Sequence, residues 1–463
     1  MNRCKRSPNR IKPTKKSVKS LYAICINSLT KHMSLCQKNE CKLSHIDAVK
    51  ELMDSENNPF ENLLSPILDE IAEVFSNSNR GNCNFRLHGF YNEKFSESPN
   101  EISLFLRKLM LTQYCQKFSL KNIDGDQAMS LLHFASVKCP DLKKLIFWNN
   151  IKISMTNCFP LISKFTKLQV LHVVASGFLY IPKEIDCLFI TLGGNCPDLR
   201  DLQLIHKNAK LFLYTMVSED GIRGLCVIGK CKLIHTLLLD EYNIVTEKVI
   251  QIVIENLPAL RIFNHRFTVR ALANLHRKAL GKKPYILPEF ALSNLGVYIG
   301  CDTKDRTNLT TTMEDCKLAV AVCPFITKVY VRYLGFELLD DDFLFLHKIK
   351  SLTNLHMKTC SFFTKQNTVI GLARLFKSVG SSLTFLKLDS FPKVDICDII
   401  EFCPNLRSIN LTCITYDDGT TKHRKKKNFL LKKLEMLYFW SNRECANFET
   451  EILSILLSSP SLY

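Results

Sequence analysis

Three stretches of the sequence share one pattern: residues 142–148 read LKKLIFW, residues 199–205 read LRDLQLI, and residues 383–389 read LTFLKLD. Each has the form apolar-x-x-apolar-x-apolar. The same form begins at residues 115, 142, 168, 199, 234, 260, 292, 326, 352, 383, 406 and 434, so successive copies start between 23 and 35 residues apart. A motif that recurs at roughly thirty-residue intervals predicts a chain built from repeated supersecondary units.

The alternation within each copy predicts a short strand with its apolar side chains on one face. Between copies, spacings such as that of Val249, Ile250 and Val253 predict a helix. This unit of strand, turn and helix resembles the leucine-rich repeat family over residues 81–463. The resemblance implies an α/β solenoid, a leucine-rich repeat horseshoe with one parallel sheet on its concave face and helices on its convex face.

Residues between the apolar positions of each strand are expected on the concave side of such a solenoid. Large aromatic side chains and arginines on an exposed surface commonly anchor protein interfaces. An alternative is that the two tryptophans, which occupy the same slot of two distant units, only pack on the next repeat. We expect the following set to bind a target protein: Trp148, His172, Gln203, Asp240, Arg266, Tyr298, Tyr330, Arg332, His356, Lys387, Asn410, Tyr438 and Trp440.

The composition describes a folded, basic chain. Hydrophobic residues make up 46% and charged residues 23%, which excludes a disordered or collagen-like protein. The net charge of +18 favours acidic proteins, nucleic acid or a membrane surface as partners. No apolar run is long enough to cross a bilayer, and no nucleic-acid-binding fold accompanies the basic clusters at 264–283 and 422–427. We therefore expect protein partners, with no membrane contact and no nucleic acid.

The cysteine usage indicates the compartment. Twenty cysteines are spread through a long chain with no signal peptide, mostly among apolar neighbours, which favours reduced and buried thiols. We expect a cytoplasmic or nuclear protein. Cys-Pro pairs at Cys139, Cys196, Cys323 and Cys403 follow predicted helices, where proline ends the helix and the small thiol packs under the turn.

The first eighty residues do not fit the repeat. Residues 1–18 are rich in lysine and arginine and lack apolar periodicity, which predicts a disordered basic tail, either a nuclear localisation signal or a merely solvated terminus. Residues 19–80 are predicted to form a helical segment that binds an adaptor or caps the array. It begins with an amphipathic helix at residues 20–29.

Four residues of that helix carry a second resemblance. Ser20 and Leu21 are followed by Cys25 and then by Leu29, with three residues in each interval. This order is similar to the BC box, by which receptor subunits of cullin-RING ubiquitin ligases bind the elongin B/C adaptor. The resemblance implies that Leu21 fills an apolar pocket, Cys25 clears the groove wall and Leu29 completes the apolar face. The place directly before a leucine-rich repeat array is similar to that in cullin-2-type receptors.

A further segment at residues 63–75 contains Leu64, Pro66 and Leu68. It resembles the cullin-contacting segment of those receptors, although Ser65 replaces the apolar residue expected before the proline. It also resembles the opening helix of an F-box, which binds a Skp1 adaptor. A structural alternative is that residues 20–75 form only a helical cap over the open edge of the first repeat.

The sequence carries no recognisable catalytic signature. It has no phosphate-binding glycine loop, no His-Glu-x-x-His helix and no Gly-x-Ser-x-Gly elbow. We expect no enzyme activity, no cofactor and no metal. The predicted function is that of a substrate-recognition subunit of a cullin-RING E3 ubiquitin ligase, with elongin B/C, a cullin and an unknown target protein as partners. The alternatives are a leucine-rich repeat scaffold without a ligase link and an F-box receptor that binds Skp1.

Overall fold

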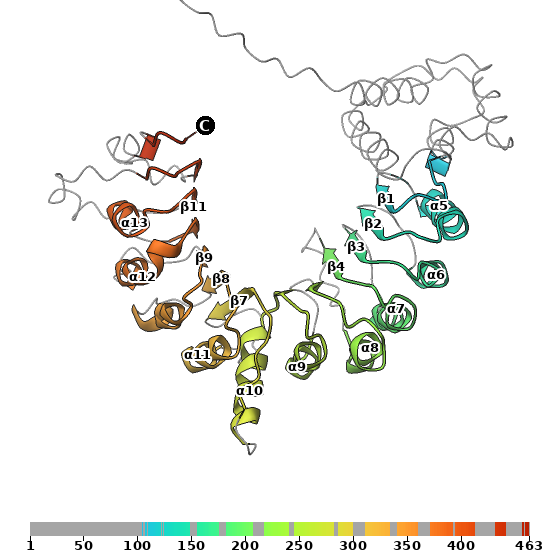
Figure 1. The fold of residues 1–463 in the computed structure, drawn as a ribbon, viewed down its shortest axis with the longest axis horizontal. Helices are drawn as coiled ribbons and strands as arrows, with labels where there is room; N and C mark the ends of the chain where they lie inside the picture. The colour runs from blue at the N-terminus through green and yellow to red at the C-terminus, as the bar shows by residue number, and fades with distance from the viewer. Residues whose placement is uncertain are drawn as a thin grey trace, which may run out of the picture. The chain divides into compact units, whose positions relative to one another are not determined.

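A computed structural model gives the fold of the chain (Figure 1). It describes residues 104, 107–108, 110–121, 123, 125–148, 155–175, 182–206, 217–239, 245–281, 286–299, 311–333, 340–359, 371–391, 394–412, 431–440, 456–457 and 459–462. Several predictions lie outside these residues, namely the basic tail 1–18 and the residues Ser20, Leu21, Cys25, Leu29, Leu64, Pro66, Leu68 and Asp240.

The chain divides into two compact units. One comprises Met1–Lys117 and His133–Cys139, and the other comprises Phe118–Leu132 and Pro140–Tyr463. The larger unit holds the repeat sheets and the site described below. No helix in the described part of the chain has both the length and the apolar character needed to span a bilayer.

The first sheet has six strands in the order of the chain, β1 to β6. Its strands are β1 (Lys117–Lys121), β2 (Lys144–Trp148), β3 (Val170–Ala175), β4 (Asp201–His206), β5 (Thr236–Leu239) and β6 (Ile262–Phe263). The helices between them are α5 (Gly125–Lys138), α6 (Met155–Ile162), α7 (Pro182–Asn195), α8 (Glu219–Ile222) with the π-helix η1 (Arg223–Val227), and α9 (Glu247–Asn256). The pairings from β2 to β6 are parallel, as the repeat pattern predicts.

The second sheet also has six parallel strands, β7 to β12. They are β7 (Asn294–Ile299), β8 (Lys328–Tyr333), β9 (Asn354–Thr359), β10 (Phe385–Asp389), β11 (Ser408–Thr412) and β12 (Met436–Trp440). Helix α10 (Thr268–Leu280) precedes this sheet. Within it lie α11 (Met313–Ala321), the 3₁₀-helix η2 (Asp340–Lys348), α12 (Gly371–Val379), the short 3₁₀ turn η3 (Gly380–Ser382) and α13 (Ile396–Phe402).

The structure thus has two sheets where one continuous sheet was expected. The strand β6 is only two residues long, because the chain turns directly after Phe263. In that turn the His265 amide donates to Thr268 Oγ1 at 3.1 Å, and the Phe267 amide donates to His265 Nδ1 at 3.3 Å. These local bonds replace the ladder that would otherwise pair β6 with β7 along its length.

A backbone ladder nevertheless runs across this point. The carbonyl of Arg261 accepts from the amides of Ser293 and Asn294 at 2.8 and 3.4 Å, and the carbonyl of Ser293 accepts from Thr327 and Lys328 at 2.9 and 3.0 Å. The same two-amide bond recurs just before β3 to β6 and β9 to β12. The repeat unit therefore continues from one sheet into the next, which agrees with an α/β solenoid.

Each strand buries alternate side chains against the helices. In β9, Leu355 and Met357 are fully buried, whereas Asn354, His356 and Lys358 are half-buried on the opposite face. Figure 1 shows the helices on one side of the strands. We call the other side, which carries the first, third and fifth residues of each strand, the helix-free face.

Helix ends follow ordinary capping rules. Thr246 and Thr312 cap α9 and α11 by accepting from the amides of Val249 at 3.3 Å and Asp315 at 3.1 Å, and Asp315 completes a capping box. The Cys-Pro prediction is confirmed for all four pairs: each helix ends one or two residues before its cysteine, and Cys139, Cys196, Cys323 and Cys403 are all buried. Burial raises the pKa of Cys196 and Cys403 to about 12, so these thiols stay protonated.

Candidate functional site

The second sheet gathers residues from distant repeats into two rows on its helix-free face. Strand register aligns the third residues of the strands as Gly296, Tyr330, His356, Lys387, Asn410 and Tyr438. It aligns the fifth residues as Tyr298, Arg332, Lys358, Asp389, Thr412 and Trp440. Eight residues expected to bind a target, from Tyr298 to Trp440, therefore lie in these rows.

The first sheet holds a smaller part of the predicted set. His172 and Gln203 share the third row there, and Trp148 is the fifth residue of β2. Arg266 lies in the turn after β6 rather than in a strand, and its guanidinium carbon is 5.1 Å from the centre of the Phe267 ring. The strand predicted at that residue was wrong because the His265 turn ends β6 first.

The polar residues of the first sheet bind one another. His172 Nε2 lies 2.9 Å from Asp201 Oδ2, and Gln203 Nε2 donates to Asp201 Oδ1 at 3.0 Å. Burial alone would raise the pKa of Asp201, but the bonds from His172 and Gln203 bring it below the ordinary value. This cluster is therefore satisfied without a ligand.

Three aromatic rings stand side by side on the second sheet. The Tyr298 and Tyr330 rings meet edge to face with centroids 6.1 Å apart, and the Tyr330 and His356 rings are 4.7 Å apart at 55°. Tyr298 is only 8% exposed, so it supports Tyr330 rather than offering a surface of its own. At the other end of the sheet, Tyr438 and Trp440 on β12 are 51% and 57% exposed.

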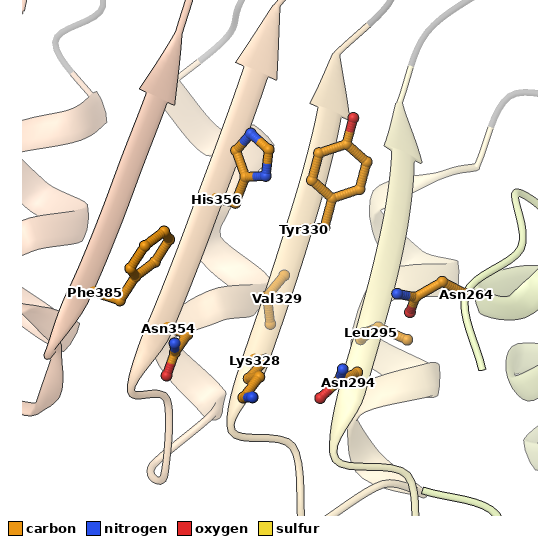
Figure 2. Close-up of a pocket in the computed structure, with 9 residues that line it drawn as sticks. All are labelled: Asn264, Asn294, Leu295, Lys328, Val329, Tyr330, Asn354, His356 and Phe385. Atoms are coloured by element: carbon orange, nitrogen blue, oxygen red, sulfur yellow. The ribbon is translucent and has the colours of Figure 1, made fainter. Parts of the chain in front are cut away.

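A hollow of about 180 Å³ opens on the same face, across β7 to β10 (Figure 2). Lys328 stands at the first position of β8, in register with Asn294 on β7 and Asn354 on β9. Tyr330 and His356 lie two residues further along their strands. The full lining consists of Asn264, Asn294, Leu295, Lys328, Val329, Tyr330, Asn354, His356 and Phe385.

Two buried polar atoms of this lining have no hydrogen-bond partner among the described residues. They are Asn264 Oδ1 and His356 Nε2. A buried polar atom without a partner is costly, and native proteins place few of them outside sites that meet a ligand, an ion or water. The hollow is therefore polar and incompletely satisfied, unlike the cluster around Asp201.

The electrostatics of the hollow are positive. Burial, with smaller contributions from Lys387 and Lys358 and against the opposing effect of Asp389, lowers the pKa of His356 to about 4, so the imidazole is neutral at pH 7. Lys358 and Asp389 form an ion pair at 2.8 Å. Burial would raise the pKa of Asp389, but bonds from Lys358 and Ser390 bring it below its ordinary value.

Sequence reasoning missed five residues that line the hollow, namely Asn264, Phe385 and the polar residues Asn294, Lys328 and Asn354. The last three are the first residues of their strands, so they share a face with the third residues that were predicted. The period of two along a strand would have found them, had it been extended one step before the first internal apolar position. Asn264 follows β6, and only the fold brings it beside β7.

Comparisons with known proteins leave the family open. No protein-family model matches the chain, and no curated protein matches it. Among solved structures, the chain is similar to one described as the crystal structure of the Rad7 and Elc1 complex in yeast, with 15% identity, 91% of this chain and 98% of that chain covered, and a TM-score of 0.44.

Proposed function

We propose that this protein is a non-catalytic substrate-recognition subunit of a cullin-RING E3 ubiquitin ligase. The observation that carries the proposal is the BC-box-like order of Ser20, Leu21, Cys25 and Leu29, placed directly before a repeat array whose sheets have one face free of helices. The first feature would bind an adaptor, and the second would bind a target. The protein would work in the cytoplasm or the nucleus.

The adaptor would be elongin B/C, held by helix-in-groove binding. Leu21 and Leu29 would supply the apolar contacts, and Cys25 would lie where only a small side chain fits. The segment with Leu64, Pro66 and Leu68 would then contact the cullin.

The target would lie against the helix-free face. Its anchors there include Tyr330, Tyr438 and Trp440, because aromatic side chains supply large contact areas at protein interfaces. The mechanism is proximity: the receptor fixes a target beside a ubiquitin-charged enzyme, which supplies the chemistry.

Capture of purified adaptors tests the proposal. The full chain and a Leu21→Ala, Cys25→Asp double variant are each incubated with elongin B/C and, separately, with a Skp1 adaptor. Asn27→Ala, in the same segment but outside the four matching positions, is the matched control. We expect elongin capture by the original chain and the control, and none by the double variant.

The other outcomes assign the alternatives. Capture of the Skp1 adaptor alone would make the protein an F-box receptor. Capture of neither adaptor would overturn the ligase link and leave a repeat scaffold.

A further inference from the structure

We propose that the hollow at the start of β7, β8 and β9 binds a glutamate or aspartate side chain of an acidic protein segment. This rests on the proposed function in one respect, namely that the segment belongs to the target. It adds the chemistry by which that target is recognised.

Three hydrogen-bond donors line one edge of the hollow. Asn294, Lys328 and Asn354 are in register on neighbouring strands, which lie about 4.8 Å apart in a sheet. The Thr353 hydroxyl donates to Asn354 Oδ1 at 2.8 Å, and the Ser293 hydroxyl lies 3.3 Å from Asn294 Oδ1. With the amides in this orientation, which Figure 2 draws for Asn294 and Asn354, their NH₂ groups are the donors left for a ligand. An ammonium between two amide donors suits a carboxylate, which only accepts hydrogen bonds.

The two buried atoms without a hydrogen-bond partner, His356 Nε2 and Asn264 Oδ1, also suit an acidic residue of a peptide. His356 is a neutral imidazole, and in the tautomer with its proton on Nε2 it donates to a carboxylate oxygen. Asn264 Oδ1 is an acceptor and suits a backbone N–H of the bound segment. An acidic residue within a peptide supplies both groups at once, a carboxylate and an N–H.

A position without a side chain lies beside Asn264 of the lining. Gly296 is the third residue of β7, beside Tyr330 in register, where the other strands of this sheet carry a side chain. A Cβ at Gly296 would stand 3.3 Å from Tyr298 Cε2 and 3.8 Å from Asn264 Oδ1. At about 180 Å³ the hollow is smaller than the pockets of roughly 300–1,000 Å³ that hold drug-sized ligands, so it fits one side chain. Phe385 offers an apolar wall for the methylene groups.

The charge of the surrounding face favours an acidic protein over nucleic acid. Lys328 and Lys387 attract a carboxylate of the bound segment. Lys358 instead forms an ion pair with Asp389 at 2.8 Å. A phosphate backbone that crossed the strands would meet Asp389 in the fifth row, whereas a single carboxylate in the hollow avoids it.

Peptide binding to the purified full chain tests the proposal. The probe is a fluorescein-labelled peptide of ten glutamates, measured by anisotropy at 150 mM salt, with a peptide of ten glutamines as the neutral control. We expect the glutamate peptide to bind at least tenfold more tightly.

Substitutions then locate the site. Lys328→Gln and Asn354→Ala should each weaken binding at least fivefold. Lys377→Gln removes the same charge from an exposed position on α12 and should change binding less than twofold. Gly296→Ala adds a methyl group beside Asn264 of the lining without changing any charge and should also weaken binding at least fivefold. Thermal melting of each variant shows that the fold is kept.

Three results would overturn the inference. The first is no binding of the glutamate peptide. The second is equal weakening by Lys328→Gln and Lys377→Gln, which would reveal only general attraction to a basic protein. The third is binding of a ten-nucleotide polyuridine RNA that these variants abolish while peptide binding persists. Elongin capture by Lys328→Gln is measured in parallel. This measurement distinguishes a failure of peptide binding at the hollow from a failure of the proposed elongin binding.

Discussion

The two sheets share one backbone pattern but present different helix-free faces. In the first sheet, the polar residues His172, Asp201 and Gln203 bind one another, and their neighbours in the third row are the apolar Ile146 and Leu238. In the second sheet, the hollow leaves Asn264 Oδ1 and His356 Nε2 buried without a partner. The repeat pattern thus determines the core, whereas the residues between the apolar positions decide which part of the array can receive a ligand.

The largest loss of stability should come from truncating a buried leucine, and it should be similar in both sheets because the same strand positions face the core in each. Leu202→Ala in β4 and Leu355→Ala in β9 each empty a fully buried site and should lower the free energy of unfolding by about 2–5 kcal/mol. Urea denaturation measures both. If only one of the two variants lost less than about 1 kcal/mol of unfolding free energy, the two cores would not be equivalent.

Adding a methyl group should cost more stability at Gly193, which packs closely against η1, than at Gly296, which lies beside the hollow. A Cβ on Gly193 in α7 would overlap the backbone carbonyl of Gly224 in η1, so Gly193→Ala should destabilise the protein by about 3 kcal/mol. At Gly296 the nearest atom is a ring edge at 3.3 Å, and Gly296→Ala should cost less than about 1 kcal/mol. Thermal unfolding of the two variants makes the comparison, and a reversed order would contradict our account of the hollow.

The pH dependence should reveal His356. Its folded pKa of about 4 lies below the ordinary 6.5, so the unfolded chain binds a proton that the folded chain does not. Stability should therefore fall as the pH drops from 6.5 towards 4. His356 should contribute about 1 kcal/mol to this loss of unfolding free energy, less than the full pKa shift implies, because solvent screens the half-exposed ring.

His356→Gln should flatten the stability profile in this pH window, as measured by urea midpoints. Equal slopes for the original chain and His356→Gln would contradict the prediction.

The smallest effect should come from the exposed aromatic residues of β12. Trp440 is 57% exposed, so Trp440→Ser should change the free energy of unfolding by less than about 0.5 kcal/mol. Tyr298→Ser, at an 8% exposed ring in the same row, should cost about 3 kcal/mol. Similar costs from urea denaturation would mean that Trp440 packs on the array instead of facing a partner.

Much of the fold could be predicted from the sequence, because the apolar positions follow the physics of a single repeat. The period of about thirty residues predicted parallel strands such as β9 and β10 and the helices between strands. The Cys-Pro pairs predicted the buried cysteines at the ends of four helices. The break at β6 could not be predicted, since it depends on bonds that His265 makes to its own turn. The period did not indicate η2 as a 3₁₀-helix either.

The candidate site was predictable in part. Alternation placed Tyr330, His356 and Lys387 in one row, as the register confirms. The hollow is lined in part by Asn264, which belongs to the preceding repeat and lies beside Gly296, a residue with no side chain. Features of this kind arise from contacts between repeats, and a pattern within one repeat does not contain them.

Photo-crosslinking tests the central claim, that recognition belongs to the second sheet, most directly. A glutamate peptide with a benzophenone at its centre is irradiated with the full chain, and the attachment sites are found by mass spectrometry. We predict attachment within residues 294–298, 328–332, 354–358 and 385–389. Attachment concentrated on β2 to β5 of the first sheet, or spread over the helices, would contradict the account.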